Sequence, residues 1–177
     1  MTNKTNNYIA ITLLLTLGVA TRFFPHPANF TAVGALALFG GLYLPKKWAV
    51  VAPMTVMLVS DLFIGFYAWQ VMLSVYSGFA IIGLIGLKVR QNKKISTVLG
   101  GTLLGSTIFF LLTNLAVWAF GTMYAHNFYG LMQSYYLALP FFKNSLLADL
   151  TYVSILVGGY ELLALKQREF KAHRQTT

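Results

Sequence analysis

The chain has 177 residues, of which 57% are hydrophobic, 15% aromatic and 10% charged. A soluble domain carries about 25% charged residues, so this composition, with a mean hydropathy of +0.66, excludes an ordinary soluble protein. The 13 basic and 4 acidic residues give a net charge of +9, which in a membrane protein records orientation rather than nucleic-acid binding, because Lys and Arg stay in cytoplasmic loops. The absence of cysteine excludes disulfides and thiolate metal sites.

Six apolar stretches follow one another along the chain, and each is an unbroken run rather than the alternating pattern of a barrel strand. We therefore predict an all-α integral membrane protein with a single domain, residues 1–177. The predicted spans are residues 8–24, 28–44, 48–67, 71–87, 97–120 and 145–165.

The first span has a second interpretation. Lys4, the apolar run from Tyr8 and the small residues at 18–20 also fit a secretory signal peptide with its cleavage site. We expect a retained helix, and cleavage remains the alternative.

The connections between the spans differ in length. Residues 45–47 and 68–70 are three-residue links, so the second, third and fourth helices must be antiparallel neighbours. Residues 23–27 place two prolines around His26, and residues 121–144 form a predicted 24-residue loop of the kind that works as a lid or binding element. Within that loop, residues 130–139 are predicted to form a short helix at the membrane interface.

The basic residues assign an orientation. With six spans and the N-terminus inside, eleven basic residues fall on the cytoplasmic side, and Arg22 and Lys143 fall outside. This distribution predicts that both termini are cytoplasmic. The eleven are Lys4, Lys46, Lys47, Lys88, Arg90, Lys93, Lys94, Lys166, Arg168, Lys171 and Arg174.

Polar residues concentrate towards the outer ends of the spans, where an ionisable group is costly and is by default a functional candidate. Together with the polar residues of the outer loops, they predict a ligand pocket that opens to the outside. The candidate ligand-binding residues are Arg22, His26, Asn29, Asp61, Asn114, Trp118, Asn144 and Asp149.

Internal pairing is the alternative explanation for these polar residues. Arg22 would then neutralise Asp61 or Asp149, Asn114 would bond across helices, and Asn29 or Thr31 would cap the second helix. Glu161, near the cytoplasmic end of the last span, is predicted to be an interface residue.

Two pairs of small residues stand four apart, Gly101 with Gly105 and Ala37 with Gly41. Such spacing lets helices approach closely, and we expect it to serve packing within the chain. The known motifs of metalloproteases, serine hydrolases and nucleotide-binding proteins are missing. We therefore expect a protein that is not an enzyme and has no cofactor, and any active transport would draw on an ion gradient or a partner ATPase.

The layout of six helices under 200 residues, with an extended first connection above an outer pocket, resembles the substrate-binding S components of energy-coupling-factor transporters. Four strings also resemble a family of small bacterial membrane proteins of unknown function that looks distantly related to S components. These strings are residues 29–41, 60–65, 113–118 and 139–149.

The S-component resemblance implies capture of a vitamin-like micronutrient from outside a bacterial inner membrane, with delivery through a transmembrane coupling protein and ATPase subunits. The ligand would be aromatic or cationic: Asp61 and Asp149 would supply negative charge, Asn114 and Asn144 hydrogen bonds, and Trp118 a stacking face. The loop around His26 would be the lid. The first span lacks the Ala-x-x-x-Ala docking pattern typical of S components, so the chain would act alone or dock through another surface such as the Ala37–Gly41 face.

Two other functions remain as alternatives. One is a scaffold or assembly subunit of a larger membrane complex, in which the polar residues serve stability and no small molecule binds. The other is metal-ion uptake through His26, Asp61, His126 and Asp149, which lack the short spacing of a metal-binding motif.

Overall fold

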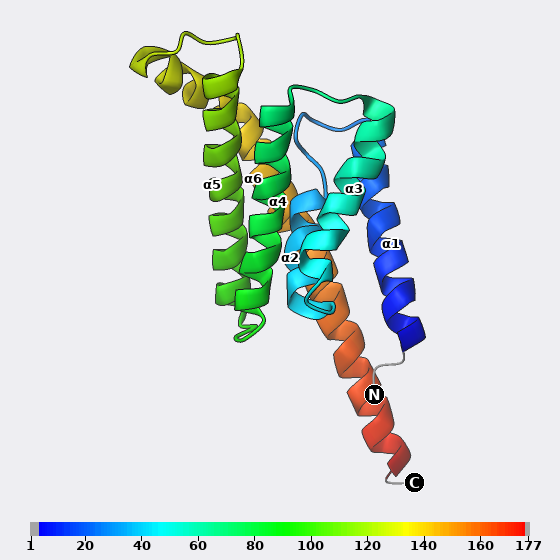
Figure 1. Ribbon diagram of the computed structural model, residues 1–177. Coiled ribbons are helices and arrows are strands. Elements are labelled where there is room, and N and C mark those ends of the chain that lie inside the picture. Colours follow the sequence, from blue (N-terminus) through cyan, green and yellow to red (C-terminus); the bar gives the residue numbers. More distant parts are fainter. Residues whose placement is uncertain (1–3, 176–177) are drawn as a thin grey trace.

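The computed structural model describes residues 4–175, and within them the chain folds as an all-α protein (Figure 1). Short connections join consecutive helices, so the chain runs up and down through the bundle. The helices are α1 (Lys4–Phe23), α2 (Val33–Tyr43), α3 (Trp48–Ile64), α4 (Trp69–Val89), α5 (Ile95–Phe120) and α6 (Phe128–Gln175).

Three of the helices are long and apolar enough to cross a membrane: α4, α5 and the apolar part of α6. Many large apolar side chains on the outer surface are exposed, for example Leu103, Leu104 and Ile155. An exposed apolar surface of this kind suits contact with lipid rather than water. The chain therefore has the character of a multi-pass membrane protein.

The shortest helix, α2, lies at the centre of the bundle. Its 11 residues extend about 16 Å at 1.5 Å per residue, roughly half of a bilayer core. Ten of the 11 are buried, and α2 contacts all five other helices. The predicted span began at residue 28, but the helix begins at Val33, because residues 24–32 form an extended connection above it.

Glycines permit the close approach of α2, α3 and α4. A Cβ on Gly41 would lie 2.4 Å from the carbonyl oxygen of Gly83, and a Cβ on Gly83 would lie 1.9 Å from that of Ala49. Small residues thus pack helices of one chain together, as expected. Ala37 and Gly41 are buried within the chain, so their face is not available as the alternative surface for docking a partner.

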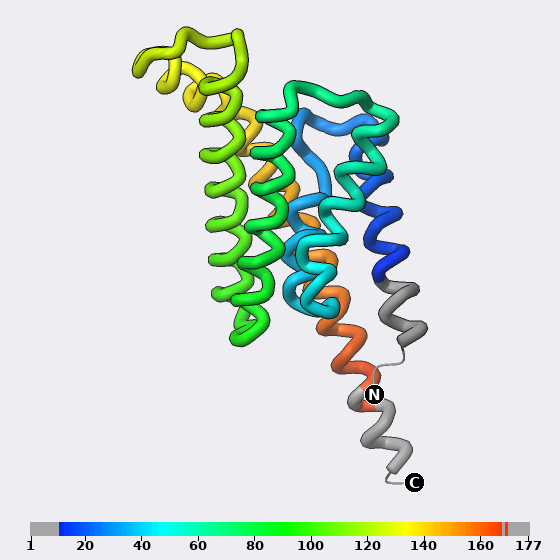
Figure 2. The backbone as a smooth tube through the Cα atoms, viewed as in Figure 1, coloured from blue at the N-terminus to red at the C-terminus, as the bar shows by residue number. Residues whose placement is uncertain are grey.

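The last helix differs most from its prediction. α6 begins at Phe128 and continues through the predicted 24-residue loop, which shrinks to the connection 121–127. The interfacial helix predicted at 130–139 exists, but it is the first part of α6. Pro140 lies inside the helix, where it removes a backbone hydrogen bond and favours a bend. The first part of α6, yellow in Figure 2, accordingly runs at an angle to the rest.

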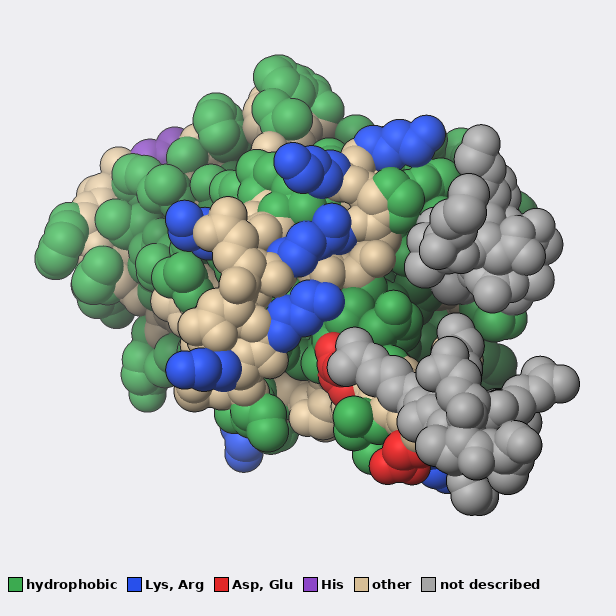
Figure 3. All heavy atoms as spheres, turned by 90° about the horizontal axis from the view of Figure 1, so that it is seen from below, with side chains coloured by type: hydrophobic (Ala, Val, Ile, Leu, Met, Phe, Trp, Pro, Cys, Tyr) green, Lys and Arg blue, Asp and Glu red, His purple; other side chains and the backbone are tan. Residues whose placement is uncertain are grey.

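The two ends of the bundle differ in charge. The connections 44–47 and 90–94 lie at one end with Lys46, Lys47, Lys93 and Lys94, and Figure 3 shows Lys and Arg side chains gathered on that end. Arg90 also lies there and donates from Nε to the carbonyl oxygen of Gly41 at 2.8 Å, which satisfies the C-terminus of α2. The connections 24–32, 65–68 and 121–127 lie at the opposite end.

Candidate functional site

A cavity of about 410 Å³ opens at the end of the bundle opposite the lysines. Residues from the end of α1, the α1–α2 connection, α2, α3, α4, α5 and α6 line it. Two of the lining residues, His26 and Asn29, are exposed and belong to the α1–α2 connection. The cavity therefore reaches the surface beneath that connection, and its volume lies in the range of small-molecule sites.

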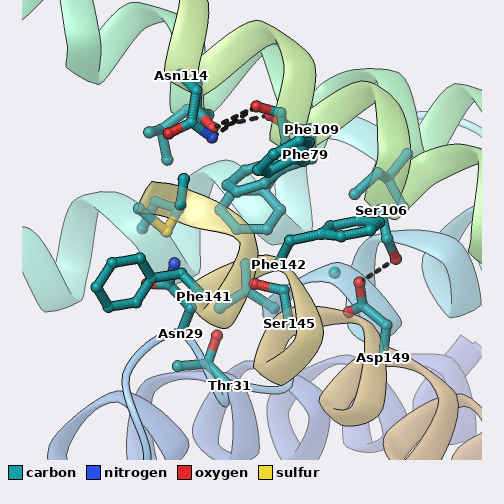
Figure 4. A pocket seen from close by; sticks show the side chains of 18 of the residues that line it. Asn29, Thr31, Phe79, Ser106, Phe109, Asn114, Phe141, Phe142, Ser145 and Asp149 are labelled. Carbon is teal, nitrogen blue, oxygen red and sulfur yellow. Dashed lines mark hydrogen bonds between the residues drawn. The ribbon is translucent and has the colours of Figure 1, made fainter. Parts of the chain in front are cut away.

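Phenylalanines form much of the cavity wall. The ring centroids of Phe79 and Phe109 lie 4.6 Å apart, and those of Phe110 and Phe142 lie 4.7 Å apart. Figure 4 shows the rings of Phe79, Phe109 and Phe142 between Asn114 on one side and Asp149 on the other. The wall is thus largely aromatic and apolar, with polar groups at a few points.

Asp149 of α6 supplies the acidic group of the cavity. It lines the cavity and is buried, with 8% of its surface exposed. Ser106 on α5 donates from Oγ to Oδ2 of Asp149 at 2.7 Å (Figure 4), and the N–H of Ala35 in the first turn of α2 faces the same carboxylate. A Cβ on Gly34 would lie 2.3 Å from Oδ1, so the carboxylate needs a glycine there to reach the N-terminus of α2.

Arg22 and Asp61 form an ion pair, with Nη1 2.6 Å from Oδ1. Arg22 also contacts Ser60, and Tyr76 on α4 donates to Oδ2 of Asp61 at 2.9 Å. Arg22 lines the cavity, whereas Asp61 is fully buried behind it and does not. Internal pairing is therefore correct for this pair, and Asp61 does not offer its charge to the cavity.

The connection above the cavity is held by a hydrogen bond within it and by one from α6. A nitrogen of His26, Nδ1, lies 2.8 Å from the carbonyl oxygen of Pro27, and Asn29 has a φ of +63°, a left-handed conformation that Asn tolerates well. Asn144 of α6 donates from Nδ2 to the carbonyl oxygen of Ala28 at 3.0 Å. Asn144 therefore stabilises the connection through this hydrogen bond, and it is not one of the residues that line the cavity.

The start of α2 is stabilised by other helices instead of by the two predicted caps. The capping position is Ala32, whose N–H donates to Oγ1 of Thr21 on α1 at 3.2 Å. Asn29 and Thr31 lie beside the cavity instead. Side chains of α1 and α6 thus serve the N-terminus of α2, which a purely local capping rule cannot foresee.

The two predicted residues of α5 have different surroundings. Asn114 lines the cavity, and its Nδ2 donates to the carbonyl oxygen of Phe110 in its own helix at 2.8 Å rather than to a neighbouring helix. Trp118 lies outside the lining and donates from Nε1 to the carbonyl oxygen of Ala125 at 3.0 Å. Its indole holds the α5–α6 connection, so it does not provide the expected stacking face.

The cavity brings together five of the eight candidate residues: Arg22, His26, Asn29, Asn114 and Asp149. The lining residues that the sequence reasoning missed are mostly aromatic or hydroxyl-bearing. The signal in the sequence for the aromatic residues was a pair of adjacent phenylalanines in α5 and another in α6. Such pairs also occur in ordinary apolar sequence of membrane helices, so they did not stand out. The missed residues include Tyr67, Phe79, Ser106, Phe109, Phe110, Phe141, Phe142 and Ser145.

Tyr67, in the connection between α3 and α4, adds a donor to the rim. Burial, with a further contribution from the charge of Asp61, raises the pKa of Tyr67 to about 12. Its phenol is therefore protonated at neutral pH.

Glu161 lies far from the cavity, near the other end of the bundle. Tyr43 of α2 donates to its Oε1 at 2.6 Å, and this bond joins α2 to α6. Glu161, predicted to be an interface residue, thus lies outside the cavity lining and takes part in a contact between two helices.

The four side chains considered for metal uptake do not assemble. Within residues 4–175, the described side chains include no group of three or more His, Asp or Glu able to hold one metal ion. Asp61 is bound to Arg22, and His126 lies over the α5–α6 connection with Nε2 3.0 Å from the carbonyl oxygen of Gly121.

Comparison with known proteins identifies a family but no characterised relative. The model of a family of unknown function (DUF6580) matches residues 2–173, nearly the whole chain. No curated protein and no solved structure matches the chain.

Proposed function

We propose that this chain, which belongs to the DUF6580 family, is a substrate-binding transport protein of the bacterial inner membrane, similar to an S component. It captures a small, vitamin-like micronutrient from the outer side and releases it for uptake without converting it chemically.

The observation that carries this proposal is the position of the cavity. It opens at the end of the bundle that bears the connections 24–32 and 65–68, whereas the lysine-rich connections 44–47 and 90–94 are at the other end. Since lysine-rich loops stay in the cytoplasm, the cavity faces outward. A site that faces outward in a six-helix membrane protein suits the capture of a solute before uptake.

The structure of the cavity supports a small-molecule ligand. Its walls are mainly apolar with a few polar groups, which is the usual character of such a site. The α1–α2 connection passes over the opening and is fastened to α6 through Asn144, so it serves as the lid. Release of the ligand then requires the hydrogen bond between Asn144 and Ala28 to break.

Energy for uptake comes from a partner in this proposal. The sequence has no nucleotide-binding motif, and the resemblance to S components implies a coupling protein with ATPase subunits. The exposed apolar faces of the long helices provide the surface for lipid and for that partner.

The test is gentle purification of the protein followed by mass spectrometry of retained molecules and partners. Ser145 lines the cavity, so Ser145→Trp fills it, while Ser154 lies on an exposed part of the same helix and Ser154→Trp is the matched control. We expect a small molecule with the wild-type protein and the control, and none with Ser145→Trp.

Two results would contradict the proposal. A stoichiometric membrane partner without any small molecule would support a scaffold instead. A molecule retained equally by Ser145→Trp would place the binding site outside the cavity.

A further inference from the structure

We propose that the ligand of this cavity is an organic cation: a protonated amine, with Asp149 as its counter-ion, attached to an aromatic or other apolar body. This inference rests on the proposed function and specifies the class of its ligand.

The charged groups around the cavity favour a cationic ligand. The lining holds one basic guanidinium, that of Arg22, one carboxyl group, that of Asp149, and the imidazole of His26. Arg22 is already paired with Asp61, and the ion pair between them is the one found in the described part of the chain. The partners of Asp149 are neutral: the hydroxyl of Ser106 and backbone at the start of α2. Asp149 thus has only neutral partners among the described residues, and a cationic ligand can supply its counter-ion.

For an anionic ligand, the guanidinium of the lining is already paired with a carboxylate of the protein. An anion that drew Arg22 away from Asp61 would leave that fully buried carboxylate without its counter-ion. Leaving one charge of a buried pair unpaired is strongly unfavourable. It would also approach Asp149 with a like charge. The lining therefore selects against carboxylates and phosphates.

The aromatic wall favours a cation with an apolar body. Phe79, Phe109, Phe110 and Phe142 lie in two close pairs along the cavity. The faces of aromatic rings attract positive charge, and this attraction grows when water is excluded. The same rings pack against a planar or apolar body, so both parts of the proposed ligand have a complementary surface.

An inorganic cation is a poorer match to this lining. Divalent ions require several oxygen or nitrogen ligands around one point, whereas Asp149 is the lone carboxylate of the cavity, and its nearest side-chain partner is Ser106. A protonated amine needs fewer partners, because each N–H makes one directed hydrogen bond.

The test uses three probes that share an indole ring and differ in charge: tryptamine, neutral tryptophol and anionic indole-3-propionate. Tritiated tryptamine is bound to the purified full-length protein, and the other two compete with it. We expect tryptamine to bind at least about tenfold more tightly than tryptophol, as a charge-assisted hydrogen bond implies, and indole-3-propionate to compete least. Equal or better competition by tryptophol or indole-3-propionate would overturn the inference.

A pair of charge-removing variants assigns the preference to one residue. Asp149→Asn keeps an acceptor for Ser106 but removes the charge, and we expect the preference for tryptamine over tryptophol to fall to about onefold. Glu161→Gln removes a charge from the same helix outside the cavity and should keep the preference. An unchanged preference in Asp149→Asn would contradict the inference. If that variant does not fold, the competition in the wild-type protein still decides.

The outcomes separate this inference from the proposed function. A retained molecule that is neutral or anionic, lost in Ser145→Trp, would overturn the ligand class and leave the transport function in place. Binding of none of the three probes, with no retained molecule in the wild-type protein, would overturn both.

Discussion

Nη1 of Arg22 lies 2.6 Å from Oδ1 of Asp61, and this ion pair joins the end of α1 to the last turn of α3. Tyr76 extends the contact to α4 through a hydrogen bond to the second carboxylate oxygen. Three helices are therefore tied together beside the cavity. Removing the charge of one partner leaves the other buried and unpaired, which costs more than removing both.

We expect Asp61→Asn to lower the free energy of unfolding by about 3–5 kcal/mol, as for other broken buried pairs. The double variant Arg22→Leu with Asp61→Leu should lose less than Asp61→Leu alone, because no charge stays uncompensated. Unfolding in mixed detergent micelles measures both. Losses in the double variant equal to the sum of the single losses would contradict the pairing.

Gly34 is predicted to be essential for the position of Asp149. In Gly34→Ala, the new Cβ would lie 2.3 Å from Oδ1 of Asp149, so the carboxylate or α2 must shift, at a cost of about 1–3 kcal/mol. Binding of tryptamine should weaken as well. Gly158→Ala is the control, since a Cβ there meets nothing within 4 Å. Equal stability of the two variants, measured by thermal unfolding, would argue against this contact.

Gly83 on α4 should tolerate substitution least of the packing glycines. Its Cβ would lie 1.9 Å from the backbone carbonyl oxygen of Ala49 on α3, and a backbone atom cannot move aside without separating the helices. We expect Gly83→Ala to give little folded protein in size-exclusion chromatography. Gly100→Ala, at a position with open space, should behave as the wild type, and a similar yield for Gly83→Ala would refute the packing described for α3 and α4.

Asn144 is predicted to control the lid rather than the fold. Asn144→Ala removes one hydrogen bond, to Ala28, so stability should fall by about 0.5–1.5 kcal/mol. Hydrogen exchange over residues 24–32 should become faster, and bound tryptamine should dissociate sooner. Lys143→Ala, a neighbour on the same helix, should change neither rate. Unchanged exchange in Asn144→Ala would exclude the fastening role.

The orientation can be tested because the chain has no cysteine. Lys93→Cys and Lys143→Cys each introduce a single thiol, at opposite ends of the bundle. In intact cells a maleimide that cannot cross the membrane should label Lys143→Cys, and should label Lys93→Cys only after lysis. Labelling of Lys93→Cys in intact cells would reverse the proposed topology.

The helical character and the positions of most connections followed from apolar runs and charge, because these depend on local composition. Two features did not follow. The continuation of α6 through Pro140 depends on packing of its first part beside α5, where Tyr135 donates to the carbonyl oxygen of Leu111 at 3.0 Å. The capping of α2 depends on Thr21, a residue eleven positions away on another helix.

The polar residues of the candidate site could be predicted from the sequence, and its aromatic residues could not. Charged and amide side chains stand out in an apolar sequence, so Arg22, Asn114 and Asp149 were found. The aromatic wall was not, because Phe109 and Phe142 look like any lipid-facing residue until the helices are placed. The aspartate that Arg22 neutralises was not predictable either, since it depends on the distances between helices.

The short central helix has a consequence for how the protein is made. α2 contacts α6, which is synthesised last, and it is too short to cross a bilayer core alone. Its native surroundings are therefore complete only after α6 has been synthesised. We therefore expect the longer helices to insert first and α2, with the cavity beside it, to take its place in a later step within the membrane. A chain truncated before α6 should accordingly be recognised and degraded by membrane proteases.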